Sequence, residues 1–156
     1  MLTGGNRGNR REYLKHALFF LEQRAGRVLD YSAVYETEPW GFEDKTPFLN
    51  QALLMETGLD PLDFLRKVHD IEYQLGRRRE EQQYAGRTID IDIIFFGDRI
   101  VSVPGLEIPH PRMTRRRFVL IPVNDICPDW IHPVLKVPVH HLLERCEDRS
   151  GVKQWE

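Results

Sequence analysis

Hydrophobic and polar residues along the chain alternate with the period of a helix in some segments and of a strand in others. The order of these segments predicts a fold that mixes helices and strands. A helix-spaced apolar stripe runs over 10–24, after Asn9 as a capping residue. Asp60 and Pro61 predict the start of a second helix, which ends at Gly76. Segments rich in β-branched, aromatic and other apolar residues predict strands over 28–35, 48–57 and 88–96.

A short apolar segment, 1–3, adds a first strand, so the order becomes β-α-β-β-α-β. This is the order of the split βαβ, ferredoxin-like unit. We therefore expect an α+β fold: a ferredoxin-like sandwich with a mostly antiparallel sheet, helices on one face, and a C-terminal extension. In that Pro-rich extension we expect an extended piece over 103–110 and helices over 114–119 and 139–146. The length of 156 residues, without repeats or linkers, predicts one domain over 1–156.

Two aspartates stand in the most hydrophobic of the predicted strands. Side chains alternate across a strand, so Asp90 and Asp92 share one face while the intervening isoleucines share the other. Two like charges on such a strand are costly unless a cation offsets them. Mg²⁺ accepts one or two carboxylates and completes its octahedron with water and phosphate oxygens. The pair therefore indicates a magnesium site, although such pairs also occur facing solvent or paired with Arg.

Several arginines flank these aspartates in the sequence. Arg77 opens the polar segment before the strand, Arg87 lies three residues before Asp90, and Arg116 stands in a run of arginines. Carboxylates for a metal and guanidinium groups for phosphates are what a triphosphate requires. The glycine-rich segment 4–9 lacks the Lys-Ser/Thr ending of a P-loop. These features favour transfer of a phosphoryl-type group from ATP by an enzyme outside the P-loop class.

Aromatic residues and one amide indicate a second subsite, for a flat ring. Phe48 and Asn50 lie two residues apart and therefore on the same face of their strand. Trp40 borders the long loop before them, and Phe118 follows the run of arginines. Aromatic rings can sandwich a flat substrate, and an amide can recognise the donors and acceptors of a heterocycle. Core packing is the alternative for the two phenylalanines, whereas an amide in an apolar strand requires partners.

Composition excludes several classes of protein. A net charge of −2 argues against a polycation that binds nucleic acid or anionic membranes. No stretch reaches the roughly 18 apolar residues of a membrane helix, and no apolar signal segment follows the first residues. Cys127 and Cys146 show no metal or redox spacing. We expect a cytoplasmic monomer that acts on small molecules, without a nucleic-acid or membrane partner.

In combination, the motifs resemble those of the 6-hydroxymethyl-7,8-dihydropterin pyrophosphokinase family of folate biosynthesis, over nearly the whole chain. The matching motifs are Gly4-Gly5-Asn6, Ser32-x-x-Tyr35-x-Thr37-x-Pro39-Trp40-Gly41, Phe48-Leu49-Asn50-x-Ala52, Glu72-x-x-x-Gly76-Arg77-x-Arg79, Arg87-Thr88-Ile89-Asp90-Ile91-Asp92-Ile93 and Ile108-Pro109-His110-Pro111-x-Met113. The resemblance implies that ATP is the co-substrate and that two Mg²⁺ ions participate. The hydroxymethyl oxygen of the pterin would attack the β-phosphorus of ATP, and AMP would leave.

The resemblance also implies a role for each candidate residue. Asp90 and Asp92 would hold the two Mg²⁺ ions and, together with Arg77 and Arg87, form the catalytic set. The residues that bind ATP would be Glu72, Arg77, Arg87, His110 and Arg116. The residues that bind the pterin would be Thr37, Trp40, Phe48, Asn50 and Phe118.

The segment 77–86 departs from the family pattern. Glu80 and Gln83 stand where well-known members have basic residues, and Tyr84 stands in place of a Trp. We expect these changes to alter the contacts of this segment with ATP. We also expect the segment to be mobile without ligand, since long irregular loops commonly are.

Three other interpretations remain open from the sequence. A nucleotidyl transferase or cyclase with two metal-binding aspartates would turn over nucleotides without a pterin. An RNA-binding module can share the β-α-β-β-α-β order, but its Arg/Lys-Gly-Phe-type signature is missing. A non-catalytic relative would bind the same small molecules for regulation.

Overall fold

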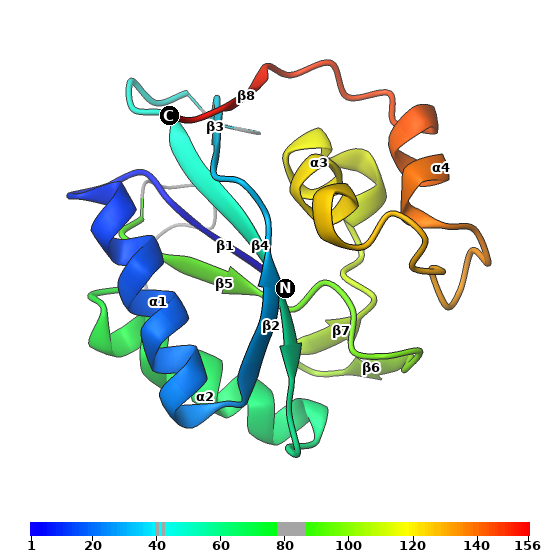
Figure 1. Cartoon of the computed structure of the whole chain (residues 1–156), viewed down its shortest axis with the longest axis horizontal. Coiled ribbons are helices and arrows are strands. Elements are labelled where there is room, and N and C mark those ends of the chain that lie inside the picture. The colour runs from blue at the N-terminus through cyan, green and yellow to red at the C-terminus, as the bar shows by residue number, and fades with distance from the viewer. Residues whose placement is uncertain (40, 42, 78–86) are drawn as a thin grey trace.

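The computed structural model describes residues 1–39, 41, 43–77 and 87–156 (Figure 1). In chain order the elements are β1 (Leu2–Gly5), α1 (Arg10–Arg24), β2 (Arg27–Tyr31), β3 (Tyr35–Thr37), β4 (Phe48–Glu56), α2 (Pro61–Gln74), β5 (Asp90–Asp92), β6 (Val101–Val103), β7 (Leu106–Ile108), a 3₁₀ turn (Met113–Arg115), α3 (Arg117–Ile126), α4 (Val139–Arg145) and β8 (Val152–Gln154). Among the described residues, no helix combines the length and the apolar character needed to cross a membrane.

The central sheet has the strand order β5-β1-β4-β3-β8, and β2 also pairs with β4. Every pairing between described strands is antiparallel. The structure confirms the mixed fold of helices and a mostly antiparallel sheet. Because β1 lies between β4 and β5, its Gly4 stands opposite Asn50 on one side and Asp90 on the other. This register brings the two predicted subsites to neighbouring positions.

Helices cover both faces of the sheet (Figure 1). The expected cover of one face is provided by α1 and α2, whereas α3 and α4 lie on the other. Side chains of β4 alternate between the two faces of the sheet. Leu49 and Leu53 pack in the hydrophobic cluster with α1 and α2, and Ala52 packs in the cluster with α3 and α4. In the region of β5, Ile89, Ile91 and Ile93 belong to the first of these clusters.

The two predicted helix starts are confirmed by their caps. The side chain of Asn9 accepts a hydrogen bond of 3.3 Å from the backbone N–H of Glu12. Asp60 accepts one of 2.9 Å from the backbone N–H of Asp63, with Pro61 in the first turn of α2. Each cap satisfies a backbone donor that the helix itself cannot pair.

Two predicted strands are shorter than expected. The prediction of a strand over 88–96 is wrong in length, because β1 offers partners only to Asp90–Asp92. The predicted strand 28–35 is interrupted between β2 and β3. At the interruption Ser32 keeps the pairing with Ala52: its N–H donates to the Ala52 carbonyl, and its hydroxyl accepts from the Ala52 N–H, each over 2.9 Å.

The C-terminal part differs most from expectation. The predicted extended piece 103–110 is part of a hairpin formed by β6 and β7. The predicted helix 114–119 is displaced, since α3 begins at Arg117 and continues past Pro122 to Ile126. The predicted helix 139–146 is confirmed as α4, and the added strand β8 pairs with β3.

Candidate active site

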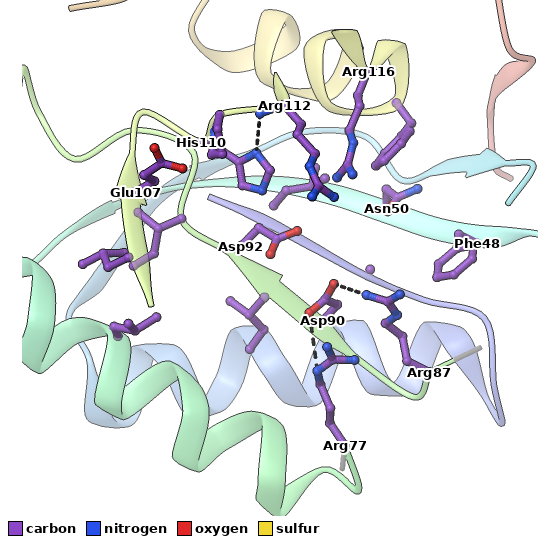
Figure 2. Close-up of a pocket in the computed structure, with 18 of the residues that line it drawn as sticks. Phe48, Asn50, Arg77, Arg87, Asp90, Asp92, Glu107, His110, Arg112 and Arg116 are labelled. Atoms are coloured by element: carbon purple, nitrogen blue, oxygen red, sulfur yellow. Dashed lines mark hydrogen bonds and ion pairs between the residues drawn. The ribbon is translucent and has the colours of Figure 1, made fainter. Parts of the chain in front are cut away.

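A cleft of about 720 Å³ lies on the face of the sheet that carries α3 (Figure 2). Its volume is in the range of small-molecule sites, about 300–1,000 Å³. Strands β1 and β5 form its floor, through Gly4, Asp90 and Asp92. The hairpin of β6 and β7 borders one side, and the start of α3 borders another.

Asp90 is held by two arginines that come from opposite ends of the segment 78–86. The Nη1 atom of Arg87 donates to Asp90 Oδ2 over 2.6 Å, and Arg77 Nε lies 3.6 Å from Asp90 Oδ1. Burial alone would raise the pKa of Asp90, but the charges of Arg77 and Arg87 and the hydrogen bond from Arg87 outweigh it and hold that pKa below its ordinary value. Asp90 is therefore an ionised carboxylate at neutral pH.

Asp92 has a different environment, although it points into the same cleft (Figure 2). Within the described parts of the chain, no hydrogen bond or ion pair reaches its carboxylate. Burial and the neighbouring charge of Asp90 raise the pKa of Asp92 to about 7, while Arg116 and Arg87 oppose that change. Ionised Asp92 is thus the carboxylate of this pair that most needs a further cation.

The donor set of this floor fits Mg²⁺ better than a metal held entirely by protein. The described residues contain no group of three or more His, Cys, Asp or Glu side chains that could hold a metal ion. Two carboxylates on one face of β5 match the one or two that Mg²⁺ takes when water and phosphate oxygens supply its other ligands. A metal at Asp90 and Asp92 would therefore complete its coordination with water and with the oxygens of a bound phosphate.

His110 faces the floor from the opposite side of the cleft (Figure 2). Its Nδ1 atom accepts a hydrogen bond of 3.2 Å from the backbone N–H of Arg112, which assigns the proton of the neutral ring to Nε2. Burial and the charges of Arg116 and Arg112 lower the pKa of His110 to about 4, against an opposing effect of Asp90. At neutral pH His110 is therefore an uncharged donor.

The amide end of the cleft is fixed by a short chain of contacts. Asn50 is buried, and its Nδ2 donates to the hydroxyl of Thr37 over 2.8 Å. The absence of a side chain at Gly4 makes room for the amide, since a Cβ there would lie 2.2 Å from Asn50 Oδ1. Thr37, Asn50 and Gly4 all line the cleft. The amide orientation is therefore set by three neighbouring strands.

Two aromatic rings lie at the same end, each beside an arginine. The guanidinium carbon of Arg87 is 5.9 Å from the centre of the Phe48 ring, and that of Arg116 is 5.6 Å from the centre of the Phe118 ring. Both rings line the cleft and are only partly buried. The two rings are therefore available to a flat ligand. Arg87 lies between the two ends of the cleft, because it contacts both the Phe48 ring and Asp90.

Residues 1–128 match the family described as 7,8-dihydro-6-hydroxymethylpterin-pyrophosphokinase (HPPK). The chain belongs to this family. It is 44% identical over 138 residues to the 2-amino-4-hydroxy-6-hydroxymethyldihydropteridine pyrophosphokinase of Porphyromonas gingivalis, which covers 86% of this chain and 93% of that protein. It is 42% identical over 125 residues to the enzyme of the same name from Bacillus subtilis, covering 80% of this chain and 74% of that one.

Solved structures of the HPPK family share the fold. The wild-type HPPK-DHPS of Plasmodium falciparum, with pteroate, superposes with a TM-score of 0.75 at 18% identity. The match covers 92% of this chain and 43% of that chain, so this chain spans less than half the length of that protein. At this identity the similarity shows the fold alone.

The cleft brings together almost all residues to which the resemblance to HPPK assigns a role. The residues that line it are Thr37, Phe48, Asn50, Arg77, Arg87, Asp90, Asp92, His110, Arg116 and Phe118. Trp40 lies outside the described residues, as do Glu80, Gln83, Tyr84 and the expected mobility of the segment that contains them.

Glu72 is placed behind the cleft rather than on its surface. Its side chain is 1% exposed, and its Oε2 accepts a hydrogen bond of 3.0 Å from the backbone N–H of Ile91. The same oxygen lies 3.6 Å from Arg77 Nε. In this structure Glu72 supports β5 and Arg77 from behind, and its predicted contact with ATP stays a prediction.

Sequence reasoning missed one side of the HPPK cleft. The hairpin contributes Ser102, Val103 and Glu107, and α2 contributes His69. The signal for the hairpin was present as Pro104-Gly105 between two apolar runs, a dipeptide that marks a turn. For His69 no local signal distinguishes a cleft residue from an exposed helix position.

Proposed function

We propose that this chain transfers a pyrophosphoryl group from ATP to 6-hydroxymethyl-7,8-dihydropterin, releasing AMP in folate biosynthesis. The observation that carries the proposal is one cleft with two chemically different ends. The carboxylates of β5 stand at one end and the Asn50 amide at the other, and Gly4 is paired with both Asn50 and Asp90. The names of the bacterial relatives support the same reaction.

The amide end is suited to the pterin. A pterin is flat and carries amide-like donors and acceptors along one edge. Asn50 Nδ2 donates one of its two N–H groups to Thr37 Oγ1, so its Oδ1 can accept from the ligand and its second N–H can donate to it. Phe48 and Phe118 would hold the ring on its two faces. The hydroxymethyl group would then point toward β5.

The carboxylate end is suited to the polyphosphate. Three arginines line this end: Arg77, Arg87 and Arg116. Their guanidinium groups can form ion pairs with a triphosphate, and Arg77 and Arg87 can do so with or without keeping their contact with Asp90. The Nε2–H of neutral His110 is a further donor to a phosphate oxygen. A neutral donor adds a directed hydrogen bond without adding a positive charge beside Arg112 and Arg116.

Asp90 and Asp92 would hold two Mg²⁺ ions, which would neutralise charge on the phosphates when bound. In the transfer itself, the hydroxymethyl oxygen forms a bond to the β-phosphorus. The bond from that phosphorus to the oxygen bridging the α- and β-phosphates breaks, AMP leaves, and the hydroxyl proton passes to water. This chemistry depends on alignment and charge neutralisation more than on a strong base.

The finer fold and assembly statements belong to the same proposal. We propose that the elements β1, α1, β2 with β3, β4, α2 and β5 form a ferredoxin-like core and that 1–156 act as one domain. The strand order supports this. We further propose a cytoplasmic monomer without a nucleic-acid or membrane partner. Light scattering of the purified protein would contradict the monomer if it gave twice the mass of one chain.

The test is formation of AMP from Mg²⁺, ATP and the reduced hydroxymethylpterin. We expect AMP only when the pterin is present, and we expect Asp92→Asn to reduce the rate at least 100-fold, on the order of the loss of one key electrostatic group. The matched control is Asp98→Asn, which removes the same charge from an exposed turn after β5. AMP formation that survives Asp92→Asn would refute the metal assignment, and AMP formation without pterin would favour a nucleotidyl transferase.

A further inference from the structure

The residues after α4 form a segment that joins two sides of the cleft. We call residues 147–155 the C-terminal strap. The match to the HPPK family model covers residues 1–128 and ends before this segment. In Figure 1 the strap runs from α4, passes over α3 and ends beside β3.

At its far end the strap is fixed to the sheet. Its strand β8 pairs with β3 so that Val152 stands opposite Thr37. The backbone N–H of Trp155 donates to the carbonyl of Val34 over 2.8 Å, and its ring lies 5.6 Å from the guanidinium carbon of Arg11. The strap therefore adds a strand to the edge of the sheet beside the residue whose hydroxyl receives the Asn50 amide.

At its near end the strap holds the first residue of α3. A carboxylate oxygen of Asp148 accepts a hydrogen bond of 2.9 Å from the backbone N–H of Arg117. Arg116, the residue before the helix, supplies no side-chain cap of its own. The negative charge of Asp148 stands at the positive end of the helix, and Ser150 N–H donates to its other oxygen over 2.9 Å.

The capped residue lies between two residues of the cleft. Arg116 and Phe118 both line the cleft, on either side of Arg117 in the sequence. Fixing the Arg117 backbone therefore fixes the position from which the Phe118 ring faces the ligand. The same segment also contacts Thr37 through β8. One continuous piece of chain therefore holds both Phe118, on the aromatic side of the pterin end, and Thr37, on its amide side.

From these contacts we infer that Asp148 is a positioning residue for the pterin end of the cleft. The inference rests on the proposed function. Asp148 does not line the cleft, and it acts by holding the start of α3, from which Phe118 lines the cleft together with Asn50 and Thr37. Asp148 lies 31 positions after Arg117, from whose N–H it accepts a hydrogen bond. The position of the first turn of α3 in the cleft therefore depends on the C-terminal strap.

The experiment compares pterin binding, turnover and thermal unfolding in three variants. Asp148→Ala removes the acceptor, Asp148→Asn keeps an acceptor oxygen but removes the charge, and Glu147→Ala removes an exposed neighbouring carboxylate as the matched control. We expect Asp148→Ala to raise the pterin Kd roughly 3- to 30-fold, the fold-change equivalent to the stability that a helix cap contributes, because binding would then have to order the start of α3. Asp148→Asn should recover most of the affinity, and Glu147→Ala should leave it unchanged.

The outcomes separate the two proposals. A merely structural role would lower the melting temperature of Asp148→Ala and the fraction of active protein, while the pterin Kd and KM of the folded fraction stayed within twofold of the parent; that result would overturn the inference alone. A parent protein that neither binds the pterin nor forms AMP would overturn the proposed function, and the inference with it. A raised Kd in Asp148→Ala with recovery in Asp148→Asn would support both.

Discussion

Arg87 and Asp90 form an ion pair of 2.6 Å between residues three positions apart, with only 14% and 22% of their side chains exposed. Arg66 and Asp63 form a second pair of the same length and spacing on the surface of α2, with 73% and 49% exposed. The two pairs differ in burial, and Asp90 also has Arg77 within 3.6 Å. They therefore provide a matched comparison of what the pair in the cleft contributes.

We predict that Arg87→Ala lowers the free energy of unfolding by about 1–3 kcal/mol, because it leaves a partly buried carboxylate without its shortest ion pair. It should also reduce AMP formation more than tenfold. Arg66→Ala should cost less than about 1 kcal/mol, as exposed pairs do, and leave turnover unchanged. Urea unfolding and steady-state kinetics of both variants test this. Equal effects of the two substitutions would show that burial of the Asp90 pair is unimportant.

Gly4→Ala should disturb the amide end of the cleft. The added methyl would lie 2.2 Å from Asn50 Oδ1 and 3.1 Å from the Leu49 carbonyl, so the amide must move. We expect a loss of about 1–3 kcal/mol of stability, typical of overpacking, and a weaker affinity for the pterin with ATP affinity nearly unchanged. The control is Gly58→Ala, because a Cβ there meets nothing within 4 Å. Unchanged pterin affinity in Gly4→Ala would contradict the role given to Asn50.

His110 should make the protein less stable as the pH falls from about 6.5 to about 4. Its pKa is lowered to about 4 in the folded protein, so the unfolded chain binds a proton in this interval that the folded protein does not. Stability therefore rises with pH across the interval and is fully present above the unfolded pKa of about 6.5. The contribution should be about 1–3 kcal/mol.

The measurement for His110 is urea unfolding of the protein and of His110→Gln at several pH values between 4 and 7. The glutamine cannot titrate, so the difference between the two curves isolates the histidine from the nearby Asp90, Arg112 and Arg116. We expect the parent to lose stability faster than the variant as the pH falls. Parallel curves would mean that His110 titrates normally in the folded protein.

Asp92→Asn should stabilise the protein while it abolishes turnover. In metal-free buffer at pH 8, the substitution removes one of two neighbouring, partly buried carboxylates and the repulsion between them. We expect a gain on the order of 1 kcal/mol in the free energy of unfolding, and no comparable gain from the exposed Asp98→Asn. Added Mg²⁺ with a non-hydrolysable ATP analogue should stabilise the parent more than Asp92→Asn. If Asp92→Asn destabilised the protein in metal-free buffer, repulsion between the carboxylates of Asp90 and Asp92 would not be a significant cost in the folded protein.

The parts of the fold that sequence predicted are those with local causes. Asn9 and Asp60 determine their helix starts within one turn, and the alternation of Asp90 with Ile91 places the carboxylates on one face. These features depend on neighbours in the sequence. The arginines and aspartates around β5 were likewise predictable, because their residue types indicate phosphate and metal chemistry.

The parts that sequence missed depend on partners far along the chain. The strand predicted over 88–96 is limited to Asp90–Asp92 because its partner β1 pairs with no more of it. The start of α3 is set by Asp148, which no pattern near Arg117 reveals. Glu72 looked like a cleft residue from its motif, but the packing of α2 against β5 turns it toward the backbone of Ile91.

Arg77 and Arg87 stand at opposite ends of the segment 78–86 and reach the same carboxylate of Asp90. Both ends of that segment are thus anchored at one point on the floor of the cleft. Asp90 therefore sets the position of both guanidinium groups from outside the interval that they bound. Loss of the Asp90 carboxylate would release both arginines at once, so a single side chain of β5 holds in register two of the three arginines that we propose bind phosphate.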